Sequence, residues 1–522
     1  MIRKPEGKKV LLLEIAILVI LPIVCIILAI HIRTLLKTGN DGELMKSTKL
    51  VLYEGPKSLK DTEKEDLKTT SENLRDISLM HCVDTQVKIN GQDCYVYDTN
   101  VNHSRQWSNN YSPSLSRTPV TYFDFDGKVK IEVTVPEIDL EQVKISPVSY
   151  GLKPDINKQT HTLTFYISDP DTYTVTFNDS PERALHIFAQ SIEEAPDLTD
   201  ENVVYIGPGE WNIDNIVLKD NEILYISGGA VVHGCVSGNF VKNVTVCGHG
   251  IIDGSKVAGW QGTNPQIPLK FDNCENITIK DVMVLNANAW VFQSYDTKKG
   301  LVEGLKIISP RPNGDGISLQ SCEDFMVKDC FVRTWDDSLV VKNYDTNSKN
   351  IEFDHIQIWT DFAQSMEVGY ETNKGKKENA SISDITFKNI LVLNNFHKPV
   401  ISVHNADDAV VSDITFQNIT VENAQMGCGD GAEMPYLIDL DITQNTNWSS
   451  TRERGQIRDI TIDNVNVLAG KFSPSRIKGY DETHKVENVT ITNLTILGKK
   501  INDFETGQFE IDSKTTSNLT LK

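Results

Sequence analysis

The 522-residue chain has few positive charges for its length. It contains 51 lysines and arginines against 72 aspartates and glutamates, which gives a formal net charge of -21 at pH 7 and an isoelectric point near 5.0. Because phosphate binding requires basic patches, this balance argues against nucleic acid as a partner. It also weighs mildly against a polyanionic substrate, and it says nothing about the fold.

Cysteine is scarce and is not arranged for metal binding. The nine cysteines form no C-x-x-C motif and no Cys/His cluster with zinc-site spacing. Cys82 could pair with Cys94 and Cys322 with Cys330, but buried or unpaired thiols with at most one bridge are the favoured interpretation. A phosphate-binding loop and a nucleophile elbow are also missing, so we expect neither a metal nor an organic cofactor.

Only one long hydrophobic run is present, and it lies at the N-terminus. It extends from Val10 to Ile32, about 23 residues, which is enough to span a hydrocarbon core of ~30 Å. More basic residues precede the run than follow it, which favours an N-terminus inside the cell. We therefore expect residues 1–36 to anchor the protein in the cell membrane with the remainder outside. A cleaved signal peptide and a secreted protein are the alternative.

The next two segments differ in texture. Residues 37–80 are rich in charge and poor in large apolar residues, which predicts a stalk or linker. Residues 81–202 contain short alternating segments such as "VKIEVTVPEI", "LTFYISD" and "YTVTFND", separated by turn clusters such as "DPDT". Regular short strands without helical periodicity are typical of a β-sandwich.

A repeat fills residues 203–522. Asn or Asp precedes an alternating apolar segment, as in "ENITIKDVMVL", "SDITFKNILVL" and "ENVTITNLTIL". Recurrence of strand-sized segments with Asn/Gly turns and no helical period indicates a solenoid, and we predict an all-β, right-handed parallel β-helix. The positions taken as equivalent are Val244, Ile277, Leu301, Phe325, Ile351, Ile385, Ile414, Ile460 and Val489.

Three aspartates gather on one side of this solenoid. Asp315 lies in "RPNGDGISL", and Asp336 and Asp337 lie in "TWDDSLVVK". Aligning apolar positions places Asp315 under Asp337 and Asp337 under Gln364, one coil apart, at a spacing of ~4.8 Å. In the same register Glu367 points outward. Three carboxylates therefore converge on one patch of the outer wall.

Converging carboxylates raise one another's pKa, so that one can stay protonated near neutral pH. A protonated acid beside ionised carboxylates is the equipment for glycosidic bond hydrolysis. Two other interpretations stay open at this point, a solvated turn ladder and a calcium site. Asp407 and Asp408 form a second pair without a partner one coil away, and we expect a solvated turn there.

The segments "SPRPNGDGISLQSC" and "TWDDSLVVKNYD" resemble the polygalacturonases of glycoside hydrolase family 28. They also resemble the dextranases and isopullulanases of family 49, which share the β-helical clan. The resemblance implies inverting hydrolysis with Asp336 as general acid and with Asp315 and Asp337 activating water. Inverting enzymes usually separate acid and base by ~6.5–9.5 Å, so we expect Asp336 to be offset from at least one partner by a water-sized gap.

The two families differ in their substrate-binding segments. Polygalacturonases carry Gly-His-Gly one coil on and Arg-x-Lys a coil later, which suit an anionic sugar. Here Gln364 stands where the histidine would be, and the next coil, "HKPVISVHNADD", has no Arg-x-Lys. Together with the expected N-terminal β-sandwich, this favours a dextranase-like enzyme acting on a neutral α-linked polysaccharide or oligosaccharide. A polygalacturonase-like pectin hydrolase, a non-catalytic carbohydrate-binding surface protein and a calcium-dependent lyase are the alternatives.

Further residues are expected to contact the substrate. Asn313 and Lys342 occupy motif positions that flank the carboxylates, and Gln364 and Glu367 follow on the next coil. Aromatic side chains near the same coils could stack on sugar faces, although core packing explains each of them equally well. The predicted substrate-binding set is Asn313, Lys342, Gln364, Glu367, Trp290, Trp335 and Tyr370.

Overall fold

The computed structural model describes residues 49–62, 78–102, 115–260, 265–426 and 435–522. The expected membrane anchor, residues 1–36, lies outside these ranges, as does most of the expected linker. Within them, no helix is both long enough and apolar enough to cross a membrane. Helical structure in these ranges is limited to two 3-10 turns, Val148–Tyr150 and Gly254–Lys256.

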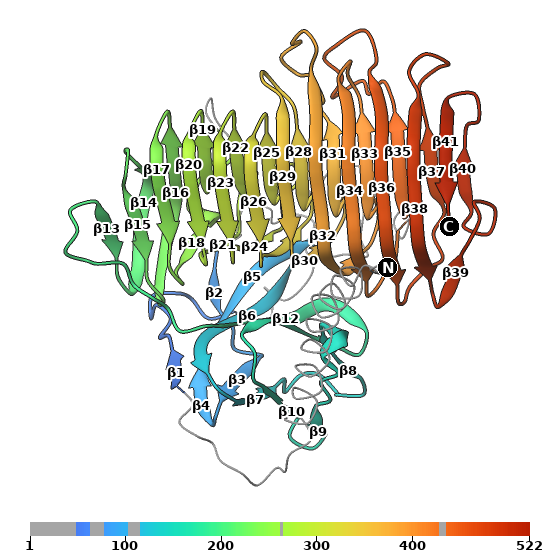
Figure 1. Ribbon diagram of the computed structural model, residues 1–522. Helices are drawn as coiled ribbons and strands as arrows, with labels where there is room; N and C mark the ends of the chain where they lie inside the picture. Colours follow the sequence, from blue (N-terminus) through green and yellow to red (C-terminus); the bar gives the residue numbers. More distant parts are fainter. Residues whose placement is uncertain (1–48, 63–77, 103–114, 261–264, 427–434) are drawn as a thin grey trace, which may run out of the picture. The chain divides into compact units, whose positions relative to one another are not determined.

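The N-terminal part of the described chain contains two sheets (Figure 1). The seven-stranded sheet contains β1 (Lys49–Leu52), β2 (Met80–His81), β5 (Val96–Asn102), β6 (Leu115–Asp126), β8 (Val143–Ser146), β11 (Asp171–Phe177) and β12 (Ser180–Gln190). The five-stranded sheet contains β3 (Gln86–Ile89), β4 (Gln92–Cys94), β7 (Val129–Thr134), β9 (Asp155–Asn157) and β10 (Thr162–Ile167).

These two sheets share one apolar core, in the region where a β-sandwich is predicted. Alternation along β7 buries Val129, Ile131 and Val133, which belong to the same cluster as Phe123 and Val175 of the other sheet. Strand β1 pairs antiparallel with β6 although it falls inside the segment predicted as a linker. Its two leucines pack against this core, which extends the sheet region to Lys49.

The rest of the chain forms one 29-stranded sheet wound into a parallel β-helix (Figure 1). Each strand pairs in parallel with the equivalent strand of the next coil, and the pairing of β38 with β39 is antiparallel. Its strands are β13 (Val203–Ile206), β14 (Gly209–Val217), β15 (Ile223–Ile226), β16 (Ala230–Asn239), β17 (Lys242–Cys247), β18 (Ile251–Asp253), β19 (Leu269–Asp272), β20 (Glu275–Lys280), β21 (Met283–Leu285), β22 (Phe292–Tyr295), β23 (Lys298–Glu303), β24 (Lys306–Ser309), β25 (Ile317–Gln320), β26 (Glu323–Lys328), β27 (Phe331–Thr334), β28 (Leu339–Lys342), β29 (Ser348–Asp354), β30 (Gln357–Thr360), β31 (Met366–Tyr370), β32 (Ser381–Asn395), β33 (Ile401–Asn405), β34 (Val410–Val421), β35 (Ile438–Ile442), β36 (Gln456–Val467), β37 (Ser475–Lys478), β38 (Val486–Ile496), β39 (Lys499–Ile501), β40 (Phe509–Ile511) and β41 (Thr516–Leu521).

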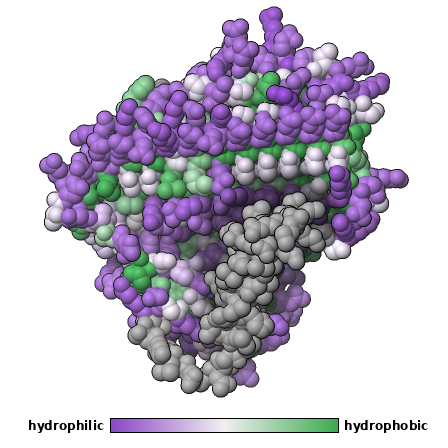
Figure 2. Space-filling model, in the orientation of Figure 1, coloured by the Kyte–Doolittle hydropathy of each residue, from purple (hydrophilic) through white to green (hydrophobic). Residues whose placement is uncertain are grey.

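Stacked side chains hold the coils in register. Phe353, Phe387 and Phe416 stack one above the other inside the coil, with ring centroids 4.6 and 5.0 Å apart. At the turns, asparagine adopts positive φ and bonds to its equivalent on the preceding coil, as where Asn276 donates to Asn243 at 2.8 Å. Outside, hydrophilic side chains run in rows along the visible face of the β-helix (Figure 2).

One predicted repeat position is wrong by a single residue. Strand pairing makes Gly300, not Leu301, the equivalent of Ile277 and Phe325. A Cβ at Gly300 would lie 2.1 Å from the Phe325 ring, so the ring of the next coil fills the space that a side chain would need. The sequence alignment was shifted by one residue because it matched apolar positions, and the apolar residue here is Leu301, next to Gly300.

All cysteines in the described ranges are free thiols, so neither proposed pair forms a bridge.

The sheet region, which is the two-sheet part of the chain from β1 to β12, and the β-helix contact each other directly. Asn286 accepts hydrogen bonds from the hydroxyl of Thr99 at 2.8 Å and from the backbone N–H of Asn100 at 3.0 Å. An apolar cluster with members from both parts, among them Tyr97, Phe188, Phe331 and Trp359, continues this interface.

Candidate active site

The three predicted aspartates lie at the entrances of stacked strands. Asp315 precedes β25, Asp336 and Asp337 precede β28, and Gln364 precedes β31. The pairing of Ile317 with Leu339, and of Leu339 with Met366, is the register predicted from the sequence. One carboxylate oxygen from each aspartate lies within 4.8 Å of one from each of the other two.

Backbone amides orient two of these carboxylates. Asp336 accepts through Oδ2 from the backbone N–H of Asn313 at 2.6 Å and through Oδ1 from that of Asp337 at 3.1 Å. Asp337 accepts from the backbone N–H of Gln364 at 3.1 Å. Asn313 adopts φ +51°, a left-handed conformation that asparagine tolerates, and this turn directs its N–H at Asp336.

Burial sets the protonation of the cluster. Asp315 is 3% exposed and Asp337 9%, whereas Asp336 is partly exposed. Burial raises the pKa of Asp315 to about 7 against the opposing effect of Lys342, with Asp336 adding to the rise. Burial, followed by the neighbouring charges of Asp315 and Asp336, raises the pKa of Asp337 well above its ordinary range. Because these groups interact closely, protons held near neutral pH belong to the cluster and not to one residue.

Lys342 is a buried cation of the site. Its Nζ lies 3.1 Å from Oδ2 of Asp315 and 3.4 Å from Oε2 of Glu371, and it sits 5.4 Å from the centre of the Trp290 ring. Burial alone would lower the pKa of Lys342, but Asp315 and Glu371 raise it well above its ordinary value. Sequence reasoning missed Glu371, although it directly follows the aligned strand β31, where the register could have indicated it.

The nearest oxygens of the three carboxylates are closer than the separation usual for an inverting acid and base. One oxygen of each lies within 4.8 Å of one from each of the other two, whereas inverting enzymes hold the two carboxyl groups ~6.5–9.5 Å apart. The expected water-sized offset of Asp336 is therefore not seen at these oxygens, and the separation of the carboxyl groups as a whole stays a prediction.

The predicted aromatic residues have different surroundings. Trp290 is half-buried and packs edge-on against Trp260 with centroids 4.8 Å apart. Trp335 is only 1% exposed and stacks on Phe362 at 4.5 Å, so it forms part of the pocket wall and presents little surface to a ligand. Tyr370 stacks on His404 at 4.5 Å with the rings 9° from parallel.

Glu367 does not line the pocket with the other predicted residues. It is fully buried, accepts from the hydroxyl of Ser402 and lies 2.9 Å from Nδ1 of His404. The other ring nitrogen of His404 lies 3.1 Å from Asp439, which in turn accepts from Arg476 at 2.8 Å. Burial would lower the pKa of His404, but Glu367 and Asp439 raise it to about 10, so the imidazole is cationic between two carboxylates.

A pocket opens above the three aspartates. It brings together nine of the ten predicted site residues, Glu367 being the exception, and adds four that sequence reasoning missed: Phe362, Glu371, Lys398 and Trp448. Lys398 lies over the Phe362 ring at 4.6 Å. Trp448 carried no sequence signal, because it comes from a long connection three coils beyond the aspartates.

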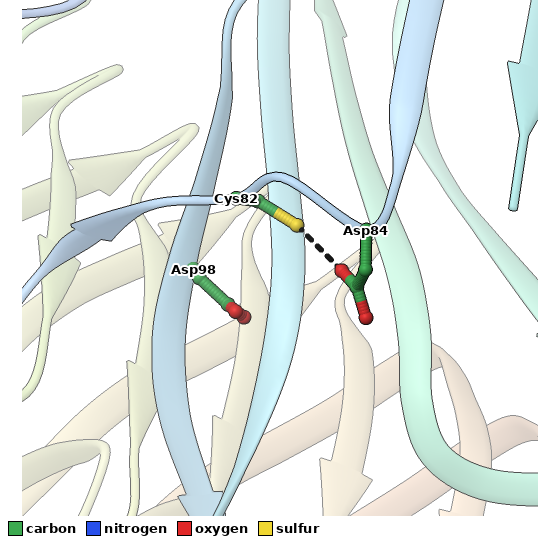
Figure 3. Close-up of side chains that lie close together, drawn as sticks. All are labelled: Cys82, Asp84 and Asp98. Atoms are coloured by element: carbon green, nitrogen blue, oxygen red, sulfur yellow. Dashed lines mark hydrogen bonds between the residues drawn. The ribbon is translucent and has the colours of Figure 1, made fainter. Parts of the chain in front are cut away.

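Two clusters in the described residues have the composition of metal sites. In the sheet region, the thiol of Cys82 donates to Asp84 at 3.0 Å, and Asp98 lies opposite (Figure 3). Arg183 also bonds to Asp84 and lies 3.5 Å from Asp98, and burial raises the pKa of the Cys82 thiol, which disfavours the thiolate that a metal would need. In the pocket, Lys342 lies 3.1 Å from Asp315, so each cluster already contains a cationic side chain.

Comparisons with known proteins agree with this geometry. A family model described as Glycosyl hydrolases family 28 matches residues 211–511. The chain is 24% identical over 178 residues to a probable polygalacturonase of Vitis vinifera, covering 30% of this chain and 35% of that protein. It is 33% identical over 105 residues to a polygalacturonase of Brassica napus, covering 18% and 26%. The chain thus spans about a third of the length of these curated relatives, or less.

Among solved structures, Dex49A from Penicillium minioluteum is similar with a TM-score of 0.61 and 14% identity, covering 92% of this chain and 99% of that one. At this identity the likeness establishes a shared fold. The family model, by contrast, covers more than half of the sequence and includes all three clustered aspartates. The chain therefore belongs to glycosyl hydrolase family 28.

Proposed function

We propose that this family 28 glycoside hydrolase cleaves a neutral α-linked polysaccharide or oligosaccharide with inversion, using Asp336 as general acid. The observation that carries the proposal is the cluster of Asp315, Asp336 and Asp337, which holds protons near neutral pH at the floor of an aromatic-lined pocket. Hydrolysis of a glycosidic bond requires a protonated carboxyl and an ionised one beside it.

Exposure supports the division of roles. Asp336 is the least buried of the three, so its carboxyl can reach the glycosidic oxygen of a bound sugar. In the proposed step it donates its proton to that oxygen while the C–O bond breaks. A water attacks the anomeric carbon from the opposite face and gives its proton to Asp315 or Asp337, whichever is ionised. The cluster ends with the same number of protons, moved from acid to base.

The surroundings of the cluster support a neutral sugar. On the coil after Gln364, Ser402 and His404 pair with Glu367 and Gly369 of β31, so these two positions carry no arginine or lysine. The positive charge of His404 is enclosed by Glu367 and Asp439 and is buried, so it offers nothing to an anionic sugar.

Polygalacturonan is the second candidate, and Lys398 is the observation that favours it. Its ammonium lies at the pocket, on the coil after Gln364, where it could meet a carboxylate of the substrate. The relatives named polygalacturonase point the same way. In this case Lys398→Met should raise KM on polygalacturonan at least tenfold, whereas the same change should leave hydrolysis of a neutral glucan nearly unaltered.

Release of reducing sugar from dextran, pullulan and polygalacturonan tests the proposal, with Asp336→Asn as the inactive control. We expect activity on a neutral glucan, unchanged by EDTA, and proton NMR should show the inverted anomer as the first product. Preference for polygalacturonan would select the second candidate, and binding without hydrolysis would indicate a non-catalytic carbohydrate-binding protein. Calcium-dependent cleavage that yields unsaturated products would indicate a lyase.

The apolar run of residues 10–32 supports export of the domain, anchored or secreted.

A further inference from the structure

Trp448 is an exposed aromatic residue at the edge of the candidate active site. Its side chain is 41% exposed, yet it lines the same pocket as the three aspartates. It lies in the connection between β35 and β36, three coils beyond β28 by strand pairing. Within residues 443–455, "TQNTNWSSTRERG", it is the only large apolar side chain, so this connection has no apolar core of its own.

A buried carboxylate holds this connection in place. Asp407 is fully buried, so the expectation of a solvated turn is wrong for this residue, whereas its neighbour Asp408 is exposed. Its Oδ1 accepts from the backbone N–H groups of Ser450 at 2.6 Å and Thr451 at 2.8 Å. Its Oδ2 accepts from the N–H groups of Thr372 at 3.3 Å and Asn373 at 3.2 Å, just after Glu371. One side chain thus joins the Trp448 connection to the segment that follows the pocket residues of β31.

A buried guanidinium completes the attachment. Arg454 is 4% exposed and donates to the carbonyl oxygen of Ala406, next to Asp407. It also donates to the carbonyls of Thr443 at 3.2 Å and Thr451 at 2.5 Å. Asp407 collects amide donors and Arg454 collects carbonyl acceptors, so both ends of the connection are fixed. Burial of a carboxyl group and a guanidinium group is costly unless their polar atoms are paired, and here backbone groups supply partners to both.

We propose that Trp448 stacks on a pyranose ring of the substrate, forming a subsite on the C-terminal-coil side of the catalytic aspartates, and that Asp407 is its positioning residue. The inference rests on the proposed function. Trp290, on the other side, precedes β22, two coils before β28, so the two indoles border the pocket from opposite directions along the coil axis. The ligand is a sugar that presents an apolar C–H face to the ring.

The test compares Trp448→Ala, Trp448→Phe and Trp211→Phe on isomaltohexaose. Trp211 is a matched control, because it is 43% exposed and lies on the first coils. We expect Trp448→Ala to raise KM for the hexasaccharide about tenfold with kcat little changed, which corresponds to the loss of one favourable contact. Trp448→Phe should restore part of the affinity, and Trp211→Phe should leave the KM for the hexasaccharide unchanged.

Asp407→Asn separates positioning from general stability. It should reproduce the KM increase, because the single oxygen of an asparagine amide cannot accept from every donor around Asp407. The far-ultraviolet circular dichroism spectrum should stay unchanged. The subsite is refuted if wild type and Trp448→Ala have equal KM values on an oligosaccharide that the wild type hydrolyses. The proposed function would not be affected by that result. If the wild type neither binds nor cleaves any of the glycans tested, the proposed function fails and this inference fails with it.

Discussion

The substitution Asp315→Asn should increase stability at alkaline pH while it abolishes hydrolysis. Burial raises the pKa of Asp315 from 3.8 to about 7, so the folded protein holds a proton that the unfolded chain releases near pH 4. Below pH 4 the carboxyl is protonated in both states and has no effect on stability. As the pH rises toward 7 the unfolded chain loses this proton first, so stability falls across that window and is level above it.

The size of the effect follows from the shift. Each pKa unit corresponds to ~1.4 kcal/mol, so ionisable Asp315 costs on the order of 4 kcal/mol of unfolding free energy above pH 7, and under ~1 kcal/mol at pH 4. Sharing of protons with Asp337 will reduce the measured value to a part of this. Asparagine keeps an acceptor for Lys342 at this position and cannot ionise, so it removes the cost.

Unfolding midpoints of wild type and Asp315→Asn, measured between pH 4 and pH 8.5, give the comparison. The advantage of the variant should grow between pH 4 and pH 7 and then stay level, and Asp384→Asn, at an exposed turn with φ +55°, is the surface control. Hydrolysis should fall at least ~10²-fold in Asp315→Asn, since water activation needs a carboxylate. A variant that is less stable than wild type by the same amount at every pH would refute the reasoning, because Asp315 would then be an ordinary stabilising partner of Lys342.

Two further pairs of substitutions test other parts of the description. The rate of hydrolysis of natural glycans should fall ~10²–10⁴-fold in Asp336→Asn. This variant should recover part of its rate on aryl glycosides with good leaving groups, whereas Asp337→Asn should not. If Asp337→Asn recovers and Asp336→Asn does not, the roles of the two residues are exchanged. Gly300→Ala should lower the unfolding free energy by ~1–3 kcal/mol in thermal denaturation, because its Cβ would meet the Phe325 ring at 2.1 Å. Leu301→Ala, at the half-exposed neighbour, should cost less, and the reverse order would contradict the observed register.

Periodic features of the fold were predictable from the sequence, and connections were not. Apolar residues at every second position fixed the stacking of Ile317, Leu339 and Met366, and this placed Asp315 against Asp337. The repeat failed at Gly300, where a ring from the next coil replaces a side chain. Trp448 could not be predicted either, because its position depends on buried bonds to Asp407, which is remote in sequence and has no periodic signature.

The buried charges along this wall differ between the pocket and the coils beyond it. Above the pocket they alternate in sign from coil to coil, from Glu367 to His404 and from Asp439 to Arg476, and each buried charge has an opposite neighbour within hydrogen-bonding distance. The alternation stops at the pocket, where three aspartates cluster and Lys342 pairs with Asp315 and Glu371. An excess of buried carboxylates can only be accommodated by keeping protons, and a retained proton beside an ionised oxygen is what glycosidic bond cleavage requires. The same excess disfavours the folded state at high pH, which is why stability and hydrolysis should respond in opposite directions when one of these acids is neutralised.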